Sequence, residues 1–436
     1  MMTVNDSSVA SSSGQIRLTW TGGTTEPQEQ PDAGAIRPVL YLTHRVPFPP
    51  DKGDRIRNYH LLRQMAARGR VWLGCLADEP VAPETVTELE RLCERVAFVP
   101  LNRQRRWLRA CGRLLGGGSI SEGAFAEPQL HRVIEQWAAE QPFQAAVVSA
   151  SSMVQYLRNS ALSQTTPVVD LVDVDSQKWL DFAAATRSFA KRWLYRLEAS
   201  RVRKLERTLP GWVRSVAVVS RAEADVYDSF TRPGAATVAA NGVDLEAFRP
   251  SPNADPVPWS CVFVGAMDYL PNIDAVVWFA HEVWPVVRAK YPAAEFRIVG
   301  RQPAPEVQQL AAIPGVKLIG QVPDVRPYVA SSAVVVVPLR LARGIQNKVL
   351  EALAMGQPVI AAPAALAGLR AEPGQHLLSA TTPVEWIDRL SELFEDVSRR
   401  RELGKAARRF VEENHHWERC LDPFLETVFA PQRGRV

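Results

Sequence analysis

The feature that most constrains the fold of this chain is the alternation of short apolar runs with longer amphipathic stretches from Pro38 onward. Strands that alternate with helices in this way are typical of βαβ units around a parallel sheet. In the first half, the apolar runs predict strands at residues 39–43, 70–76, 96–101, 145–149, 168–172 and 215–219. We therefore expect an α/β domain built on a parallel sheet.

The same alternation starts again in the second half. Residues 231–258 are rich in Pro, Gly and Asn and contain one short apolar run, as expected for a connection between domains. Beyond them, the pattern predicts strands at 260–264, 295–299, 316–319, 333–337, 359–362 and 377–379. The sequence thus predicts two Rossmann-like domains, at 37–230 and 259–412, followed by a helix at 413–430 whose packing partner stays open.

Composition agrees with a globular protein of two domains, because the chain has 436 residues, of which 46% are hydrophobic and 22% charged. No apolar run approaches the roughly 20 residues that a membrane-spanning helix needs. The five cysteines are scattered and never spaced as CxxC, so neither a disulfide framework nor a zinc site is expected. Residues 1–36 are polar and lack the apolar core of a secretory signal. We expect them to be a disordered tail and the protein to be cytoplasmic.

Basic residues are clustered in two places. Residues 103–109 (RQRRWLR) mix positive charge with Trp107, and residues 187–207 hold eight Lys or Arg against two acids, Glu198 and Glu206. Such clusters suit an anionic membrane surface or an anionic substrate, and a solvated helix face stays open as the alternative. We expect no nucleic-acid partner, and a peripheral position at the inner face of the cytoplasmic membrane fits these clusters.

The most informative loop follows the predicted strand at 333–337 and leads into a predicted helix. Ligands of parallel sheets bind beyond the carboxyl ends of the strands. Gly344 permits close approach of the backbone, and Asn347 is expected to be the helix N-cap. A helix N-terminus directs unpaired N–H groups at an anion. Positive charge beside it is expected from three side chains: Arg340, Arg343 and Lys348.

Glu351 lies one helical turn beyond Asn347, where its carboxylate can accept hydrogen bonds from a diol. A diphosphate flanked by a ribose satisfies this arrangement. The alternative is an ordinary amphipathic helix that ends at Gly356 and Pro358.

Residues 347–361 (NKVLEALAMGQPVIA) resemble the donor-binding signature of glycosyltransferase family 4. Three more segments are similar to that family: 238–250 (VAANGVDLEAFRP) to its linker motif, 263–265 (FVG) to its Val-Gly turn, and 298–300 (IVG) to a strand and glycine before a nucleotide-facing loop. The resemblance implies the GT-B fold, in which two Rossmann-like domains face each other across a cleft. C-terminal helices complete that fold.

The first half also takes part in the resemblance. Residues 47–57 (PFPPDKGDRIR) and 173–179 (DVDSQKW) look like the subgroup of sugar transferases associated with bacterial exopolysaccharide and PEP-CTERM systems. The resemblance covers almost all of residues 38–425. It implies a nucleotide-sugar donor, retention of anomeric configuration, no cofactor and no metal, with a lipid-linked or oligosaccharide acceptor.

The resemblance also implies roles for individual residues. Glu351 is expected to bind the donor ribose, and Lys348 with the backbone around Gly344 to hold the diphosphate. The whole set of expected donor-binding residues is Gly265, Asn272, Gly300, Arg301, Arg340, Arg343, Gly344, Asn347, Lys348 and Glu351. On the acceptor side and its glycine loop, we expect His44, Gly53, Arg55 and Arg57.

The sequence departs from the family at two places. Arg343 stands where many members carry a second glutamate, and residues 266–272 (AMDYLPN) lack the Arg and Lys that usually follow the Val-Gly turn. Arg340 or Arg343 is expected to supply the missing positive charge.

Asp173 and Asp175 follow the predicted strand at 168–172, and we expect one of them to act in catalysis by orienting the donor sugar or the acceptor hydroxyl. Two alternatives stay open for this pair. An aspartate in such a loop often caps a helix. The pair also matches the DxD form that binds Mn²⁺ or Mg²⁺ in GT-A transferases.

The predicted function is therefore glycosyl transfer in the synthesis of exopolysaccharide or another cell-surface glycan. A sugar-nucleotide epimerase of the same fold and an inactive nucleotide-sugar-binding protein are the alternatives. The sequence contains no G-x-G-x-x-G, no Walker phosphate loop and no nucleophile elbow, so it does not indicate a dehydrogenase, an ATPase or a hydrolase.

Overall fold

The computed structural model describes residues 37–251 and 255–431. The disordered tail that we expected at residues 1–36 lies outside these described residues.

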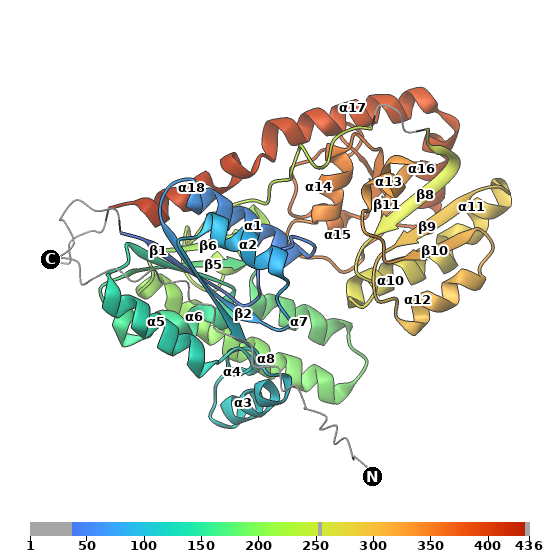
Figure 1. The fold of residues 1–436 in the computed structure, drawn as a ribbon. Helices are drawn as coiled ribbons and strands as arrows, with labels where there is room; N and C mark the ends of the chain where they lie inside the picture. The colour runs from blue at the N-terminus through green and yellow to red at the C-terminus, as the bar shows by residue number, and fades with distance from the viewer. Residues whose placement is uncertain (1–36, 252–254, 432–436) are drawn as a thin grey trace, which may run out of the picture. The chain divides into compact units, whose positions relative to one another are not determined.

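The first half folds around a seven-stranded parallel sheet in the order β3-β2-β1-β4-β5-β6-β7 (Figure 1). The strands are β1 (Val39–Thr43), β2 (Val71–Ala77), β3 (Arg95–Pro100), β4 (Ala145–Ser149), β5 (Thr166–Val172), β6 (Ser215–Val218) and β7 (Ala236–Val238). The order reverses between β1 and β4, and a crevice for ligands forms at such a switch point. The short run within residues 231–258 is β7, which adds a seventh strand to this sheet.

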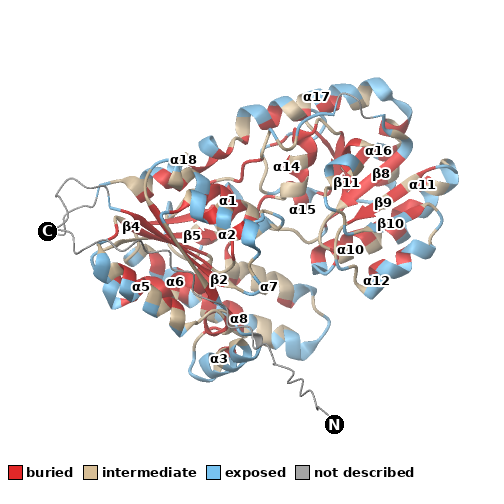
Figure 2. Ribbon diagram, in the orientation of Figure 1, coloured by how far each residue is buried: buried red, intermediate tan, exposed pale blue. Residues whose placement is uncertain are grey.

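Helices connect the strands of the first sheet. They are α1 (Gly53–Ala66), α2 (Pro83–Leu92), α3 (Arg103–Leu115), α4 (Ile120–Ala124), α5 (Pro128–Glu140), α6 (Val154–Leu157), α7 (Asp175–Ala185), α8 (Phe189–Thr208) and α9 (Arg221–Asp228). Hydrophobic clusters lie on both faces of the sheet, and the strands between them are buried (Figure 2). This explains why the strands are continuous apolar runs without alternation.

The second half contains a six-stranded parallel sheet in the order β10-β9-β8-β11-β12-β13. Its strands are β8 (Val257–Val264), β9 (Glu295–Val299), β10 (Val316–Gly320), β11 (Ser332–Val337), β12 (Val359–Ala361) and β13 (Leu378–Ser379). Its helices are α10 (Leu270–Trp278), α11 (Trp284–Lys290), α12 (Pro305–Gln309), α13 (Arg326–Ala330), α14 (Asn347–Ala354), α15 (Pro363–Leu366), α16 (Pro383–Glu395) and α17 (Val397–Asn414). The switch point lies between β8 and β11.

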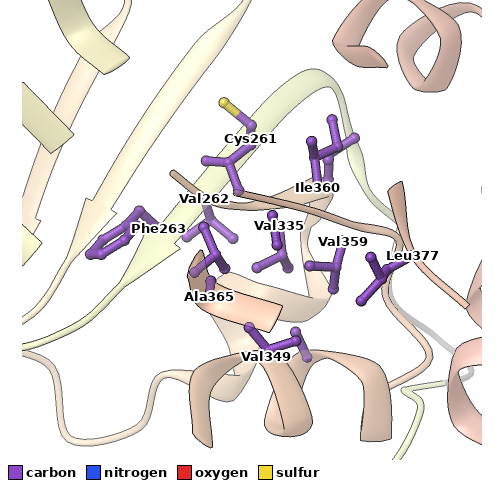
Figure 3. Packing of buried hydrophobic residues seen from close by; sticks show 14 of the residues in the cluster. Cys261, Val262, Phe263, Val335, Val349, Val359, Ile360, Ala365 and Leu377 are labelled. Carbon is purple, nitrogen blue, oxygen red and sulfur yellow. The ribbon is translucent and has the colours of Figure 1, made fainter. Parts of the chain in front are cut away.

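The core of the second half fixes the position of α14. Val349 of α14 is fully buried in one cluster with Val262 of β8, Val335 of β11 and Val359 of β12 (Figure 3). One face of α14 is thus held against the sheet, and its first turn lies just beyond the carboxyl end of β11.

The last helix, α18 (Trp417–Phe429), packs on the first sheet and not on the second. Trp417, Leu421 and Phe424 belong to the same buried cluster as Val39 of β1 and Val71 of β2. The sequence left the partner of this helix open, and the structure supplies it. The prediction of an α/β fold with two parallel sheets is confirmed.

Candidate active site

The loop between β11 and α14 ends in a helix N-terminus that no side chain caps. Gln346 is the N-cap residue and makes no side-chain capping bond, while Asn347 is the first residue of the helix. Our prediction that Asn347 is the N-cap is therefore wrong by one residue. The Asn347 side chain instead accepts a hydrogen bond from Asn241 at 3.0 Å. The N–H groups of the first turn of α14 remain suited to an anion.

Lys348 lies in the first turn of α14 and faces the loop that follows β8. Its ammonium donates to the Asn272 side-chain oxygen at 2.7 Å and lies 4.3 Å from the centre of the Phe263 ring. A Cβ atom at Gly265 would lie 2.8 Å from this ammonium and from the Asn272 side-chain nitrogen, so both side chains would have to shift. Gly300 has a similar role, because its Cβ would lie 1.7 Å from the Gly265 carbonyl oxygen. Gly265 thus leaves room for the Lys348 side chain, and Gly300 leaves room for the Gly265 backbone.

Glu351 lies in the next turn and, with Lys348, lines an apolar pocket. The pocket wall consists of Phe248, Val264, Val325, Val329, Val335, Val337, Ala352 and Met355. Burial raises the pKa of Glu351 to about 7, although the charge of Lys348 opposes this shift. Burial likewise lowers the pKa of Lys348 to about 7, against the charge of Glu351. Both groups are therefore poorly stabilised as ions by their apolar surroundings.

Gly344 brings the same loop against the first half of the chain. Its φ of +62° lies in the left-handed region, and a Cβ at this position would lie 2.2 Å from the Asp173 carboxylate. The Gly344 backbone thus lies close to Asp173, and its expected approach to a ligand stays a prediction. Burial raises the pKa of Asp173, while the charges of Lys178, Arg343 and Arg57 act in the opposite direction.

The backbone just before Asp173 is strained. Val172, the last residue of β5, has a φ of +68°, and Ala150, the first residue after β4, has a φ of +76°. A β-branched residue in this region is a true outlier, and such strain concentrates at functional sites. Asp175 has a different position, since it accepts a hydrogen bond of 2.5 Å from the Ser151 hydroxyl. Asp175, which we expected in catalysis, therefore makes a structural contact that holds the loop after β4.

A second uncapped helix N-terminus lies beside the first. Helix α1 begins at Gly53, and its N-cap residue Lys52 makes no side-chain capping bond. A Cβ at Gly53 would lie 3.9 Å from the Asn347 side-chain nitrogen, so the starts of α1 and α14 are neighbours. Two partial positive charges thus meet at this point, as an anionic ligand requires.

Two arginines that we expected on the acceptor side are used for structure. Arg57 is fully buried and makes two hydrogen bonds to Asp170, of 2.8 and 2.9 Å. Its other nitrogen donates to the Ala239 carbonyl and to the Asn241 side chain. The prediction that Arg57 faces an acceptor is wrong, because every terminal nitrogen of its guanidinium is satisfied in the core. Arg55 is buried too, where it pairs with Asp51 at 3.2 Å and with Glu79 at 3.4 Å.

His44 follows β1 and contacts Asp54 of α1 at 3.2 Å. Burial alone would raise the pKa of Asp54, but the hydrogen bond to His44 and the charges of His44 and Arg45 outweigh it and hold that pKa well below its usual range. The other ring nitrogen of His44 is buried without a partner among the described residues. His44 thus lies with Arg45 and Asp54 beside the start of α1, and this arrangement does not require a catalytic role.

The arginines that we expected beside the phosphates are paired with carboxylates. Arg340 binds Asp274 of α10 at 3.0 Å. Arg343 binds Asp181 of α7 at 2.8 Å and Glu223 of α9 at 3.0 Å. Both arginines are therefore paired with carboxylates in this structure, and the expectation that one of them supplies positive charge to the phosphates stays a prediction. Arg301 lies 4.0 Å from Asp51 of the α1 loop, which is the outer limit of an ion pair.

Lys178, for which no role was predicted, lies near Asp173. It lies in the first turn of α7 and is partly buried. Burial lowers the pKa of Lys178, but the charges of Asp175 and Asp173 outweigh it and raise that pKa above its usual value. The signal was present in the segment DVDSQKW, where a lysine follows two aspartates at helical spacing. Asn241 donates to Asn347 and lies in the linker motif at residues 238–250, and no role was predicted for it either.

No group of three or more His, Cys, Asp or Glu in residues 37–251 and 255–431 has the geometry of a metal site. Asp175 accepts a hydrogen bond from the Ser151 hydroxyl, whereas the Asp173 carboxylate lies against Gly344.

Comparison with known proteins agrees with this architecture. Residues 259–396 match the family model described as "Glycosyl transferases group 1". No curated protein matches the sequence.

Several solved structures have a similar fold over most of the chain. Sucrose-phosphate synthase from Thermosynechococcus elongatus is 17% identical, covers 89% of this chain and 98% of its own, and has a TM-score of 0.65. HepE from Anabaena, solved with UDP and glucose, is 15% identical over 90% of this chain and 99% of its own, with a TM-score of 0.64. WaaG, a glycosyltransferase involved in lipopolysaccharide biosynthesis, is 12% identical over 90% of this chain and 100% of its own, with a TM-score of 0.63.

These likenesses show the fold. The chain has the GT-B fold that the sequence predicted, and residues 259–396 carry the features of a group 1 glycosyltransferase domain.

Proposed function

We propose that this protein transfers a sugar from a nucleotide-sugar donor to an acceptor hydroxyl. The observation that carries the proposal is the first two turns of α14, where an uncapped helix N-terminus, Lys348 and Glu351 lie together at the carboxyl edge of the second sheet. A diphosphate at this N-terminus would receive backbone N–H groups and the remaining ammonium protons of Lys348. A ribose beside it would donate to the Glu351 carboxylate.

The chemistry follows from where charge develops. When an acceptor hydroxyl displaces the nucleoside diphosphate from the anomeric carbon, negative charge grows on the leaving phosphate. The start of α14 and Lys348 stabilise that charge, and the neighbouring start of α1 adds to the field. We propose retention of configuration, as the family resemblance implies, and this reaction needs no cofactor. HepE was solved with UDP and glucose, so UDP-sugars are the first donors to test.

For the acceptor side, we propose a lipid-linked or oligosaccharide acceptor in the synthesis of exopolysaccharide or another cell-surface glycan. Support comes from the subgroup resemblance of residues 47–57 and 173–179. We also propose that the protein acts as a peripheral protein at the inner face of the cytoplasmic membrane. The described residues contain no helix that is long and apolar enough to cross a bilayer, so a peripheral contact is the form that this proposal takes.

Calorimetric titration of nucleoside diphosphates and nucleotide sugars tests the donor site. We expect one of them to bind wild-type protein and the Glu402→Gln control, in which an exposed glutamate of α17 is changed, with equal affinity. Glu351→Gln should weaken the same ligand. If no nucleotide binds, or if Glu351→Gln binds as tightly as wild type, the donor-site assignment is wrong.

The two alternatives are separated by the products. An epimerase converts the donor without an acceptor, which NMR of the donor incubated with protein alone would reveal. A nucleotide-sugar-binding protein without activity would bind the donor yet form no product with any acceptor in a membrane extract. Transfer of label from the donor to the extract supports a transferase, and the anomeric coupling constant in the product tests retention.

A further inference from the structure

Helix α3 exposes an apolar face that no other part of the described chain covers. Trp107, Leu108 and Leu115 are 63%, 73% and 89% exposed. Together with the exposed Cys111, they occupy positions i, i+1, i+4 and i+8, which fall on one side of a helix. The opposite side contacts the protein, since Ala110 is buried there. An unpartnered apolar face of this kind marks an interaction surface.

Helix α8 continues the surface with aromatic and basic side chains. Phe189 and Trp193, in its first two turns, are 81% and 60% exposed. The same exposed stripe continues with Arg196, Lys204 and Arg207, at i+7, i+15 and i+18 from Phe189. Among the exposed large hydrophobic residues that the structure describes, only Val384 in the second half is exposed to a comparable degree.

Two side chains of α8 form hydrogen bonds with the backbone at the end of α3 and the start of α4. Arg201 of α8 donates to the carbonyl oxygens of Leu114 at 2.7 Å and Gly118 at 2.6 Å, at the end of α3. Glu198 of α8 accepts from the Ile120 and Ser121 N–H groups at 2.7 and 2.8 Å. The end of α3, the start of α4 and the middle of α8 are therefore neighbours in the first half, where the three helices lie close together (Figure 1).

The charge of this surface has one sign. Within the described residues no ion pair involves its exposed cations, which are Arg105, Arg187, Lys191, Arg196, Lys204 and Arg207. The acids of the same segment do not neutralise them, because Glu198 and Glu206 are buried and accept hydrogen bonds from backbone N–H groups. A second copy of the chain would bring the same positive charge and be repelled. An anionic surface with an apolar interior is complementary to both properties.

We propose that α3 and the exposed stripe of α8 dock on an anionic lipid bilayer. The side chains of Trp107, Leu108, Leu115, Phe189 and Trp193 enter the boundary between headgroups and acyl chains, and the neighbouring cations bind the headgroups. This inference deepens the proposed peripheral location by naming the residues that make the contact. It does not depend on the donor site, so the two proposals fail independently.

Cosedimentation with vesicles tests the docking surface. We expect wild-type protein to bind vesicles of phosphatidylcholine with phosphatidylglycerol, to release in high salt, and to bind pure phosphatidylcholine weakly. Replacing Arg196, Lys204 and Arg207 by Gln should lower the partition coefficient roughly 100-fold, and replacing Trp107, Leu108 and Leu115 by Ser should lower it at least about tenfold. Glu351→Gln should bind vesicles like wild type.

Matched controls come from the second half of the chain. Arg401, Lys405 and Arg409 form an exposed basic stripe on α17, and Val286, Val384 and Val397 are 52%, 65% and 47% exposed. Their replacement by Gln and by Ser should leave vesicle binding unchanged, and thermal melts should show that all variants fold. The proposal is overturned if the controls reduce binding as much, if wild type does not prefer anionic vesicles, or if the α3 variant instead dissociates a protein oligomer.

Discussion

Arg57 with Asp170, and Lys348 with Glu351, differ in how fully their hydrogen-bonding groups are used. In the first half, Arg57 and Asp170 are completely buried, share two hydrogen bonds, and Arg57 also donates to Ala239 and Asn241. In the second half, Lys348 and Glu351 are partly buried beside an apolar pocket. Lys348 makes one hydrogen bond, to Asn272.

This difference separates a structural pair from a site that is ready for a ligand. Burial disfavours the charge of Arg57, but Asp170 more than compensates and raises the pKa of the arginine. Lys348 and Glu351 compensate each other only in part, so burial moves the pKa of both to about 7. Perturbed groups with unused donors and acceptors mark functional sites, whereas a satisfied pair is a fixed part of the core.

The largest effect should come from breaking the satisfied pair. Arg57→Ala would leave Asp170 buried without its cation, and we expect the free energy of unfolding to fall by about 3–5 kcal/mol. Urea unfolding followed by circular dichroism measures this change. Arg91→Ala, which removes an exposed pair with Glu88, should leave the midpoint nearly unchanged. An equally small change in the free energy of unfolding for Arg57→Ala would show that the buried Arg57–Asp170 pair does not stabilise the fold.

Glu351→Gln should act in the opposite way to Arg57→Ala, because it should weaken donor binding and not lower the stability of the fold. A hydrogen bond to a charged group contributes about 1.5–3 kcal/mol, so we expect the affinity for the donor nucleotide to fall about 10- to 100-fold. The free energy of unfolding without ligand should rise by about 1 kcal/mol near pH 8, because a neutral amide removes a charge from an apolar pocket. Calorimetry and urea unfolding of one preparation give both numbers. A loss of stability without loss of affinity would make Glu351 a structural residue like Asp170.

Lys348 gives a prediction with a definite pH dependence. Its pKa is about 7 in the empty site, below the ordinary 10.5, because of burial. A bound diphosphate favours the ammonium form and raises this pKa, so binding at pH 8 should take up about one proton. By linkage, affinity should increase as pH falls from 9 to 7, and it should decrease again below about pH 7 because Glu351, whose pKa is also about 7, becomes protonated. Calorimetry in buffers of different ionisation enthalpy counts the protons. Lys348→Met should abolish the uptake and Lys405→Met should not.

Much of the fold was predictable because strands buried on both faces leave continuous apolar runs in the sequence. The position of Lys348 and Glu351 at the edge of the second sheet was also readable, since the loop after β11 and the start of α14 are adjacent in the chain. The pairings of Arg57 and Arg343 could not be predicted, for one physical reason. Their partners, Asp170 and Glu223, are 113 and 120 residues away, and nothing local specifies such a pairing.

Arg343 is paired with carboxylates, as Arg57 is, but it is partly exposed, as Lys348 is. We expect its replacement to have the smallest effect on stability and binding. This arginine is partly exposed, yet it holds the Gly344 loop to Asp181 and to Glu223, whose other oxygen accepts from the Val174 N–H at 2.7 Å. Arg343→Gln should lower the free energy of unfolding by only about 1 kcal/mol, because its bonds are partly in water.

The more informative effect of Arg343→Gln is on the loop. Burial and the charge of Asp173 already raise the pKa of Glu223, and Arg343 opposes this shift. Without the arginine, Glu223 should be protonated at higher pH and release the loop, so KM for the donor should rise severalfold below neutral pH while kcat changes less. Arg343→Lys, which keeps the charge, should restore the wild-type pH profile in part. An unchanged KM at every pH would mean that the bonds of Arg343 to Asp181 and Glu223 do not position the donor loop.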